Sequence, residues 1–94
     1  MLSKLPLNLE KVDKKNIDRE ILRVGIIAEL DAINFYEQLA SMTQDENLRK
    51  VIADIAKEEK THVGEFQALL LKIDEEQEKE LEEGKEEVEV LTGK

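Results

Sequence analysis

The chain has 94 residues, 40% of them hydrophobic and 39% charged, and a formal net charge of −9. This acidic balance argues against nucleic acid and anionic membrane surfaces as partners, since both need basic patches, and it suits a protein that handles cations. The absence of cysteine excludes disulfides, thiolate zinc sites and iron–sulfur clusters. We expect one small domain, and such chains often complete their core by oligomerising.

No stretch approaches the roughly 18 consecutive apolar residues of a membrane span. The first ten residues lack the long apolar stretch and the small-residue cleavage site of a signal peptide, so we expect a cytoplasmic protein. Residues 1–13 are predicted to form an irregular N-terminal arm, because Pro6 and Asn8 interrupt the leucines there.

A helical hairpin is predicted over residues 14–73. Its first helix begins near residue 14, with Asp13 and Asn16 as alternative caps. Apolar residues recur at helical spacing along one face and a neighbouring edge: Leu22, Ile26, Ile33, Tyr36 and Ala40, then Ile27, Leu30 and Leu39. An apolar arc of this width is expected where a helix packs on more than one neighbour.

The second helix is predicted to start near Gln44, because Thr43 and Glu46 have the spacing of a capping box. Its apolar stripe runs to the end of the hairpin through Leu48, Val51, Ile52, Ile55, Val63, Phe66, Leu69, Leu70 and Ile73. No run of Gly or Pro separates the two helices. The connection must therefore be tight, and the helices should be antiparallel.

Residues 74–94 are predicted to be a short third helix and an acidic tail. Asp74 is the expected cap, and residues 75–94 hold nine Glu and three Lys, with an interruption expected at Gly84. Two interpretations stay open for this segment. It is either a solvated tail or a segment that docks on a partner through its few apolar residues, Leu81, Val88, Val90 and Leu91.

Three ionisable residues occupy positions where the apolar stripes require core residues. Glu29 fills the gap in the first helix, and Glu59 and His62 fill the gap in the second. Burying an unpaired carboxylate costs on the order of several kcal/mol, so packing alone does not explain this placement. A bound cation does, because it neutralises carboxylates and accepts imidazole as a ligand.

The heights of the three residues along the hairpin also agree. Glu29 lies 14 residues before Thr43 and Glu59 lies 16 residues after it. At about 1.5 Å per residue, both lie roughly 21–24 Å from the turn. His62 follows Glu59 by one turn, which gives the Glu and Glu-x-x-His arrangement of di-metal carboxylate bundles.

Counting ligands predicts an assembly. A di-iron carboxylate site draws on about four carboxylates and two histidines, and this chain has a single histidine. One hairpin therefore supplies half a site. A two-fold homodimer would add a second Glu29, Glu59 and His62 and close an all-α, ferritin-like four-helix bundle around two metal ions.

Residues 20–75 resemble the encapsulated ferritins, short members of the ferritin-like superfamily. The resemblance rests on IIAELDAINFYE at residues 26–37, DENLR at 45–49 and EEKTH at 58–62. It implies two-helix chains with a di-iron ferroxidase site between two subunits, whose dimers assemble into a ring of ten chains. It also implies oxidation of Fe(II) with O2 inside an encapsulin nanocompartment, whose shell protein is the partner and stores the iron.

Residue by residue, the resemblance implies that Glu29, Glu59 and His62 are iron ligands. Tyr36 matches a tyrosine near the site and is assigned to the catalytic group, and Asp31 matches an acidic residue at an outer metal position. The chain departs from the family at Ala28, where some members have a second carboxylate, and at Phe35, where others have tryptophan.

The end of the chain, EVLTGK at residues 89–94, is a poor match to the short targeting peptide with which many members dock in the shell. In some systems the ferritin-like segment is instead fused to the shell protein. The resemblance therefore leaves room for this chain to be the ferritin-like segment of an encapsulin fusion.

Three rivals to the ferroxidase remain. One is a metal-stabilised adaptor or structural module without redox activity. Another is a rubrerythrin-like peroxidase half-domain, which is weakened by the absence of cysteine for a rubredoxin centre. The last is a helical hairpin dimer without metal, which would leave the charges in the apolar stripes unexplained.

Overall fold

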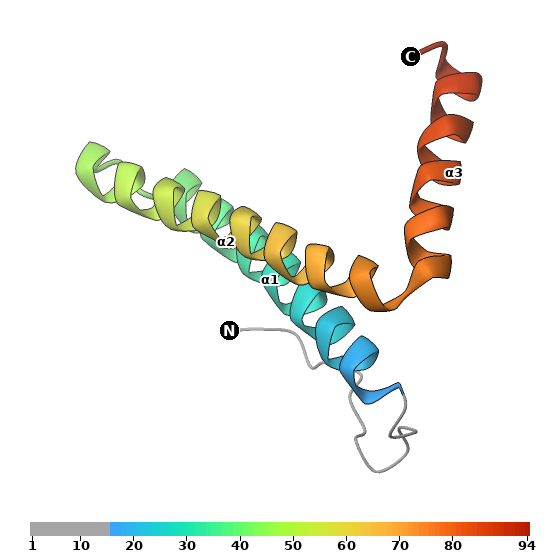
Figure 1. Cartoon of the computed structure of the whole chain (residues 1–94). Helices are drawn as coiled ribbons and strands as arrows, with labels where there is room; N and C mark the ends of the chain where they lie inside the picture. Colours follow the sequence, from blue (N-terminus) through green and yellow to red (C-terminus); the bar gives the residue numbers. More distant parts are fainter. Residues whose placement is uncertain (1–15) are drawn as a thin grey trace.

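The computed structural model describes residues 16–94, which form three α-helices: α1 (Ile17–Met42), α2 (Glu46–Ile73) and α3 (Glu75–Thr92). α1 and α2 lie side by side and antiparallel, whereas α3 turns away at the end of α2 and stands clear of the hairpin (Figure 1). The predicted all-α hairpin with a C-terminal helix is thus confirmed for the described residues. The predicted arm at residues 1–13 lies outside them, and dimerisation into a bundle stays a prediction.

The turn between α1 and α2 differs from the predicted capping box. α2 begins at Glu46 rather than near Gln44, and its cap is Asp45, whose carboxylate accepts a hydrogen bond of 2.9 Å from the Leu48 backbone amide. The Thr43 hydroxyl is used elsewhere, since it accepts a hydrogen bond from the Asp45 amide at 3.1 Å. This local turn displaces the helix start by two residues. Arg49 then closes the turn by donating to the carbonyl oxygens of Ala40 and Thr43.

Small residues bring the two helices of the hairpin together. Ala32 and Ala56 are among the few fully buried side chains, with Leu70 further along α2. A Cβ atom built on Gly25 would lie 3.1 Å from the Phe66 ring, so glycine lets that ring press against α1. The same role had been expected at Gly64, where a Cβ would meet nothing within 4 Å in this chain. Close helix approach is therefore a property of Gly25.

A large part of the apolar arc stays exposed in the single chain. Half or more of the side chain is open to solvent at four positions of the hairpin, namely Ile21, Leu30, Val51 and Leu69, which are 51–58% exposed. Two helices cannot cover both sides of their own stripes. The hairpin therefore has apolar surface left for a further packing partner.

Asp74 fixes the junction between the hairpin and α3. One carboxylate oxygen accepts a hydrogen bond of 3.0 Å from the Gln77 backbone amide and so caps α3, as predicted. The other oxygen accepts a hydrogen bond of 3.0 Å from the Arg23 guanidinium of α1. The Gln77 amide lowers the pKa of the Asp74 carboxyl, and the positive charges of Arg19 and Arg23 lower it further.

The expected interruption at Gly84 is wrong, because α3 continues through it to Thr92. One glycine costs about 1 kcal/mol in a helix, and the surrounding Glu, Lys and Leu are strong helix formers. The helix ends at Gly93, whose φ is 77° and whose amide donates to the Glu89 carbonyl at 2.8 Å. α3 has no buried residue, and none of the described helices has the length and apolar character needed to cross a bilayer.

Candidate metal centre

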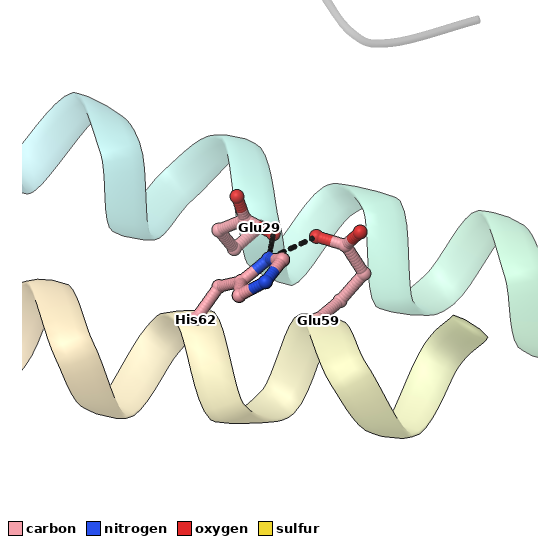
Figure 2. Close-up of side chains that lie close together, drawn as sticks. All are labelled: Glu29, Glu59 and His62. Atoms are coloured by element: carbon pink, nitrogen blue, oxygen red, sulfur yellow. Dashed lines mark hydrogen bonds and ion pairs between the residues drawn. The ribbon is translucent and has the colours of Figure 1, made fainter. Parts of the chain in front are cut away.

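The hairpin brings Glu29, Glu59 and His62 together, as their equal heights predict. Glu29 projects from α1, and Glu59 and His62 project toward it from neighbouring turns of α2 (Figure 2). One potential ligand atom from each lies within 4.8 Å of the others. Among residues 16–94, no other group of three or more His, Asp or Glu side chains is close enough to hold a metal ion. Their role as metal ligands stays a prediction.

Both carboxylates face the same nitrogen of His62. The Nδ1 atom lies 3.3 Å from Oε2 of Glu59 and 3.5 Å from Oε2 of Glu29 (Figure 2). A single Nδ1–H can be well directed to one oxygen only, and the hydrogen bond goes to Glu59. Oε2 of Glu29 is left buried with no hydrogen bond. A buried acceptor without a donor is costly, so this oxygen fits a site completed by a cation.

No Lys or Arg in the described part of the chain neutralises the two carboxylates. The cations nearby are engaged elsewhere, since Lys60 forms an ion pair of 3.0 Å with Glu37 and Arg23 pairs with Asp74. The imidazole is therefore the one basic group in contact with Glu29 and Glu59. With two carboxylates around it, the cluster has an excess of negative charge when both are ionised.

The cluster is less buried than the apolar stripes predicted. The Glu29 and Glu59 side chains are each 19% exposed, and His62 is 44% exposed. The reason is geometric, since one hairpin screens the site on one side only. On the other side lies a hollow of about 330 Å³ lined by Glu29, His62, Glu65, Phe66 and Leu69. A second molecule on this side would complete the burial.

Two further predicted site residues lie outside this cluster. Asp31 follows Glu29 by two residues, which places it about 200° around α1, and it does not join the three-residue group. The Tyr36 ring is partly buried and packs edge to face against Phe35, with ring centroids 5.3 Å apart. Their predicted roles, an outer metal position and a catalytic neighbour, stay predictions.

Sequence reasoning did not associate Glu65 with the site and treated it as a solvated neighbour of the motif. The hollow makes Glu65 part of the surroundings of Glu29 and His62. A signal was present in the sequence, because Glu65 follows His62 by three residues and therefore lies one turn further along the same side of α2.

The ligand chemistry of the cluster is that of a hard or borderline divalent metal. Carboxylate oxygens with one imidazole suit iron and also bind manganese and zinc. Two carboxylates and one histidine make half of the ligand set found in di-metal helical bundles. Fold and cluster together thus define the class: a ferritin-like helical hairpin that has half of a carboxylate–histidine centre.

Comparison with known proteins agrees with this class. The EncFtn-like family model matches residues 5–84. A "Ferritin-like-encapsulin shell fusion protein" of Pyrococcus furiosus is 59% identical over 87 residues, covering 93% of this chain and 25% of the relative. An "Encapsulin nanocompartment cargo protein EncC" of Myxococcus xanthus is 32% identical over 84 residues, covering 86% of this chain and 65% of the relative.

The fold has a solved counterpart. The crystal structure of the encapsulated ferritin domain from Pyrococcus furiosus superposes with a TM-score of 0.85 and 56% identity, covering 100% of this chain and 98% of that one. The chain therefore belongs to the EncFtn-like family. It spans only a quarter of the length of the fusion protein and 65% of the length of the cargo protein.

Proposed function

We propose that this chain is a ferroxidase that oxidises Fe(II) to Fe(III) with O2 at a di-iron site shared by two copies. The observation that carries the proposal is the cluster of Glu29, Glu59 and His62, with ligand atoms within 4.8 Å of one another and a buried Glu29 oxygen that has no hydrogen bond. A metal ion gives this oxygen a partner and offsets the carboxylate charge, which Nδ1 of His62 alone cannot do.

The second half of the site comes from a second copy of the chain. The hollow beside the cluster ends at Leu69, and Ile21, Leu22, Leu69 and Ile73 line the adjoining depression along the hairpin. An apolar surface next to an incomplete polar site is suited to an isologous two-fold contact, which would bring two clusters together across the axis. Further association of such dimers into a ring of ten chains is part of the same proposal.

The iron is the substrate of the reaction. Two Fe(II) ions each lose one electron, and one O2 accepts the pair of electrons. Glu29 and Glu59 stabilise the added positive charge on Fe(III), because their oxygens are hard anionic ligands. Nδ1 of His62 holds the iron on the α2 side, since it is the ring nitrogen that faces both carboxylates.

The place of action follows from the relatives. Their names describe a ferritin-like segment fused to an encapsulin shell and a cargo protein of an encapsulin nanocompartment. We propose the same setting for this chain, with the shell protein as its partner and iron storage as the purpose of the oxidation. The acidic surface, with a net charge of −9, would favour the approach of Fe(II).

Aerobic Fe(II) oxidation by Glu59→Gln and His62→Ala variants tests the proposal. Both should lose activity, whereas Glu58→Gln, an exposed neighbour with the same change of charge, should retain it. Wild-type rates in both ligand variants would refute the ferroxidase. Metal-dependent dimerisation of the wild type without O2 consumption would instead support the metal-stabilised structural module.

A further inference from the structure

We infer that Glu65 is a transfer residue, which receives incoming Fe(II) in the hollow and passes it to the cluster of Glu29, Glu59 and His62. The inference rests on the proposed function and adds a route by which the substrate reaches the site. It assigns Glu65 a role in the rate of loading and none in holding the bound metal.

The composition of the hollow carries the inference. Its five lining residues include Glu29 and His62 of the cluster, two apolar side chains, Phe66 and Leu69, and Glu65. An Fe(II) ion that enters this hollow loses part of its hydration. The apolar side chains cannot replace those water ligands, so the Glu65 carboxylate is the one oxygen-bearing side chain in the lining outside the cluster.

The Glu65 carboxylate is available for this role. It is exposed, and no cation or hydrogen-bond donor engages it in the described part of the chain. Other acidic side chains of the hairpin are paired, as Glu37 is with Lys60 and Glu46 is with Arg49. An unpaired carboxylate at the edge of a site attracts a cation without first breaking an ion pair.

The wall of the hollow is held in place by α1. The Phe66 ring lies so close to Gly25 that a Cβ there would approach it to 3.1 Å. Because Phe66 follows Glu65 on α2, this contact also fixes the backbone from which Glu65 projects. Glu65 is not a member of the three-residue group whose ligand atoms lie within 4.8 Å of one another. Its position therefore suits transfer better than permanent coordination.

Anaerobic rapid mixing with Co(II), which binds carboxylate and imidazole without being oxidised, tests the role of Glu65. The Co(II) absorbance should show that Glu65→Gln lowers the association rate by about three- to tenfold. Its dissociation rate and its final Co(II) stoichiometry should equal those of the wild type. Glu58→Gln, which removes the same charge one turn before His62 and outside the hollow, should load at the wild-type rate.

Three results would overturn the inference. Equal association rates for Glu65→Gln and wild type would exclude a transfer role. Equal slowing by Glu58→Gln would show a general effect of surface charge. Faster dissociation with unchanged association would make Glu65 a ligand instead. Failure of the proposed function is recognised separately, since wild type would then bind no Co(II) or would bind it without oxidising Fe(II) in air.

Discussion

The hairpin and α3 are both rich in carboxylates, yet they treat them in opposite ways. Glu29 and Glu59 face each other across the hairpin and are each 19% exposed, with a histidine as their one basic contact. The glutamates of α3 surround a helix that buries nothing. The number of acidic residues therefore says little about a site. Opposed placement on packed helices is what makes two carboxylates costly without a cation.

The largest expected effect comes from removing a ligand from the hairpin. Glu29→Ala should lower the rate of Fe(II) oxidation to below about 1% of wild type, because loss of outer partners of a metal site alone costs roughly 10–100-fold. Glu83→Ala on α3 removes the same charge from a solvated face and should leave the rate unchanged. Oxygen consumption under excess Fe(II) measures both. Comparable losses in the two variants would remove the distinction between the regions.

An apolar residue beside the site should matter nearly as much. Leu69→Asp introduces a charge into the exposed apolar surface next to the hollow and should prevent pairing, so that oxidation is lost although Glu29, Glu59 and His62 remain. Val90→Asp on α3, where the side chain is 83% exposed, is the matched control and should leave oxidation and mass unchanged. Analytical ultracentrifugation and the oxidation assay report the two properties. An active monomer of Leu69→Asp would contradict the shared site.

Two glycines give a smaller and opposite pair of effects on stability. Gly25→Ala should destabilise the hairpin by about 1–2 kcal/mol, because the new methyl group meets the Phe66 ring at 3.1 Å and overpacking outweighs the gain in helix propensity. Gly84→Ala meets nothing within 4 Å and should stabilise α3 by about 0.5–1 kcal/mol. Helicity during thermal unfolding measures both. A more stable Gly25→Ala variant would show that Phe66 moves freely.

The smallest effect is the pH dependence at the junction of the two regions. The folded pKa of Asp74 is lowered from 3.8, so its carboxylate stabilises the folded state above that pH. This contribution is lost as the pH falls below 3.8 through the folded pKa. Asp74→Asn should therefore differ from wild type at neutral pH and approach it in acid. A difference in melting temperature that stays constant through this range would contradict the proposed hydrogen bonds to Gln77 and Arg23.

Residue counting predicted a large part of the fold and the meeting of the three site residues. Helical spacing is set by backbone geometry, so the distances of Glu29 and Glu59 from Thr43 sufficed to place them face to face. Weak local preferences failed. Gly84 was expected to end a helix that its neighbours extend, and the Thr43 hydroxyl was expected to cap a helix that Asp45 caps.

The degree of burial was beyond sequence reasoning for a different reason. An apolar stripe shows that a face becomes covered but does not say which chain covers it. His62 is 44% exposed because α1 and α2 screen one side only. The hollow that includes Glu65 depends on how the Phe66 ring seats against Gly25, and this packing detail has no periodic signature. The most informative departures from prediction thus lie where a second copy would pack.

Native mass spectrometry of the purified chain, with and without anaerobically added Fe(II), tests the shared site most directly. The account predicts assemblies that contain an even number of chains and bind about two iron ions per pair. His62→Ala should bind none. A monomer that binds two iron ions by itself, or dimers that bind none at saturating Fe(II), would contradict the central claim that Glu29, Glu59 and His62 of two copies form one site.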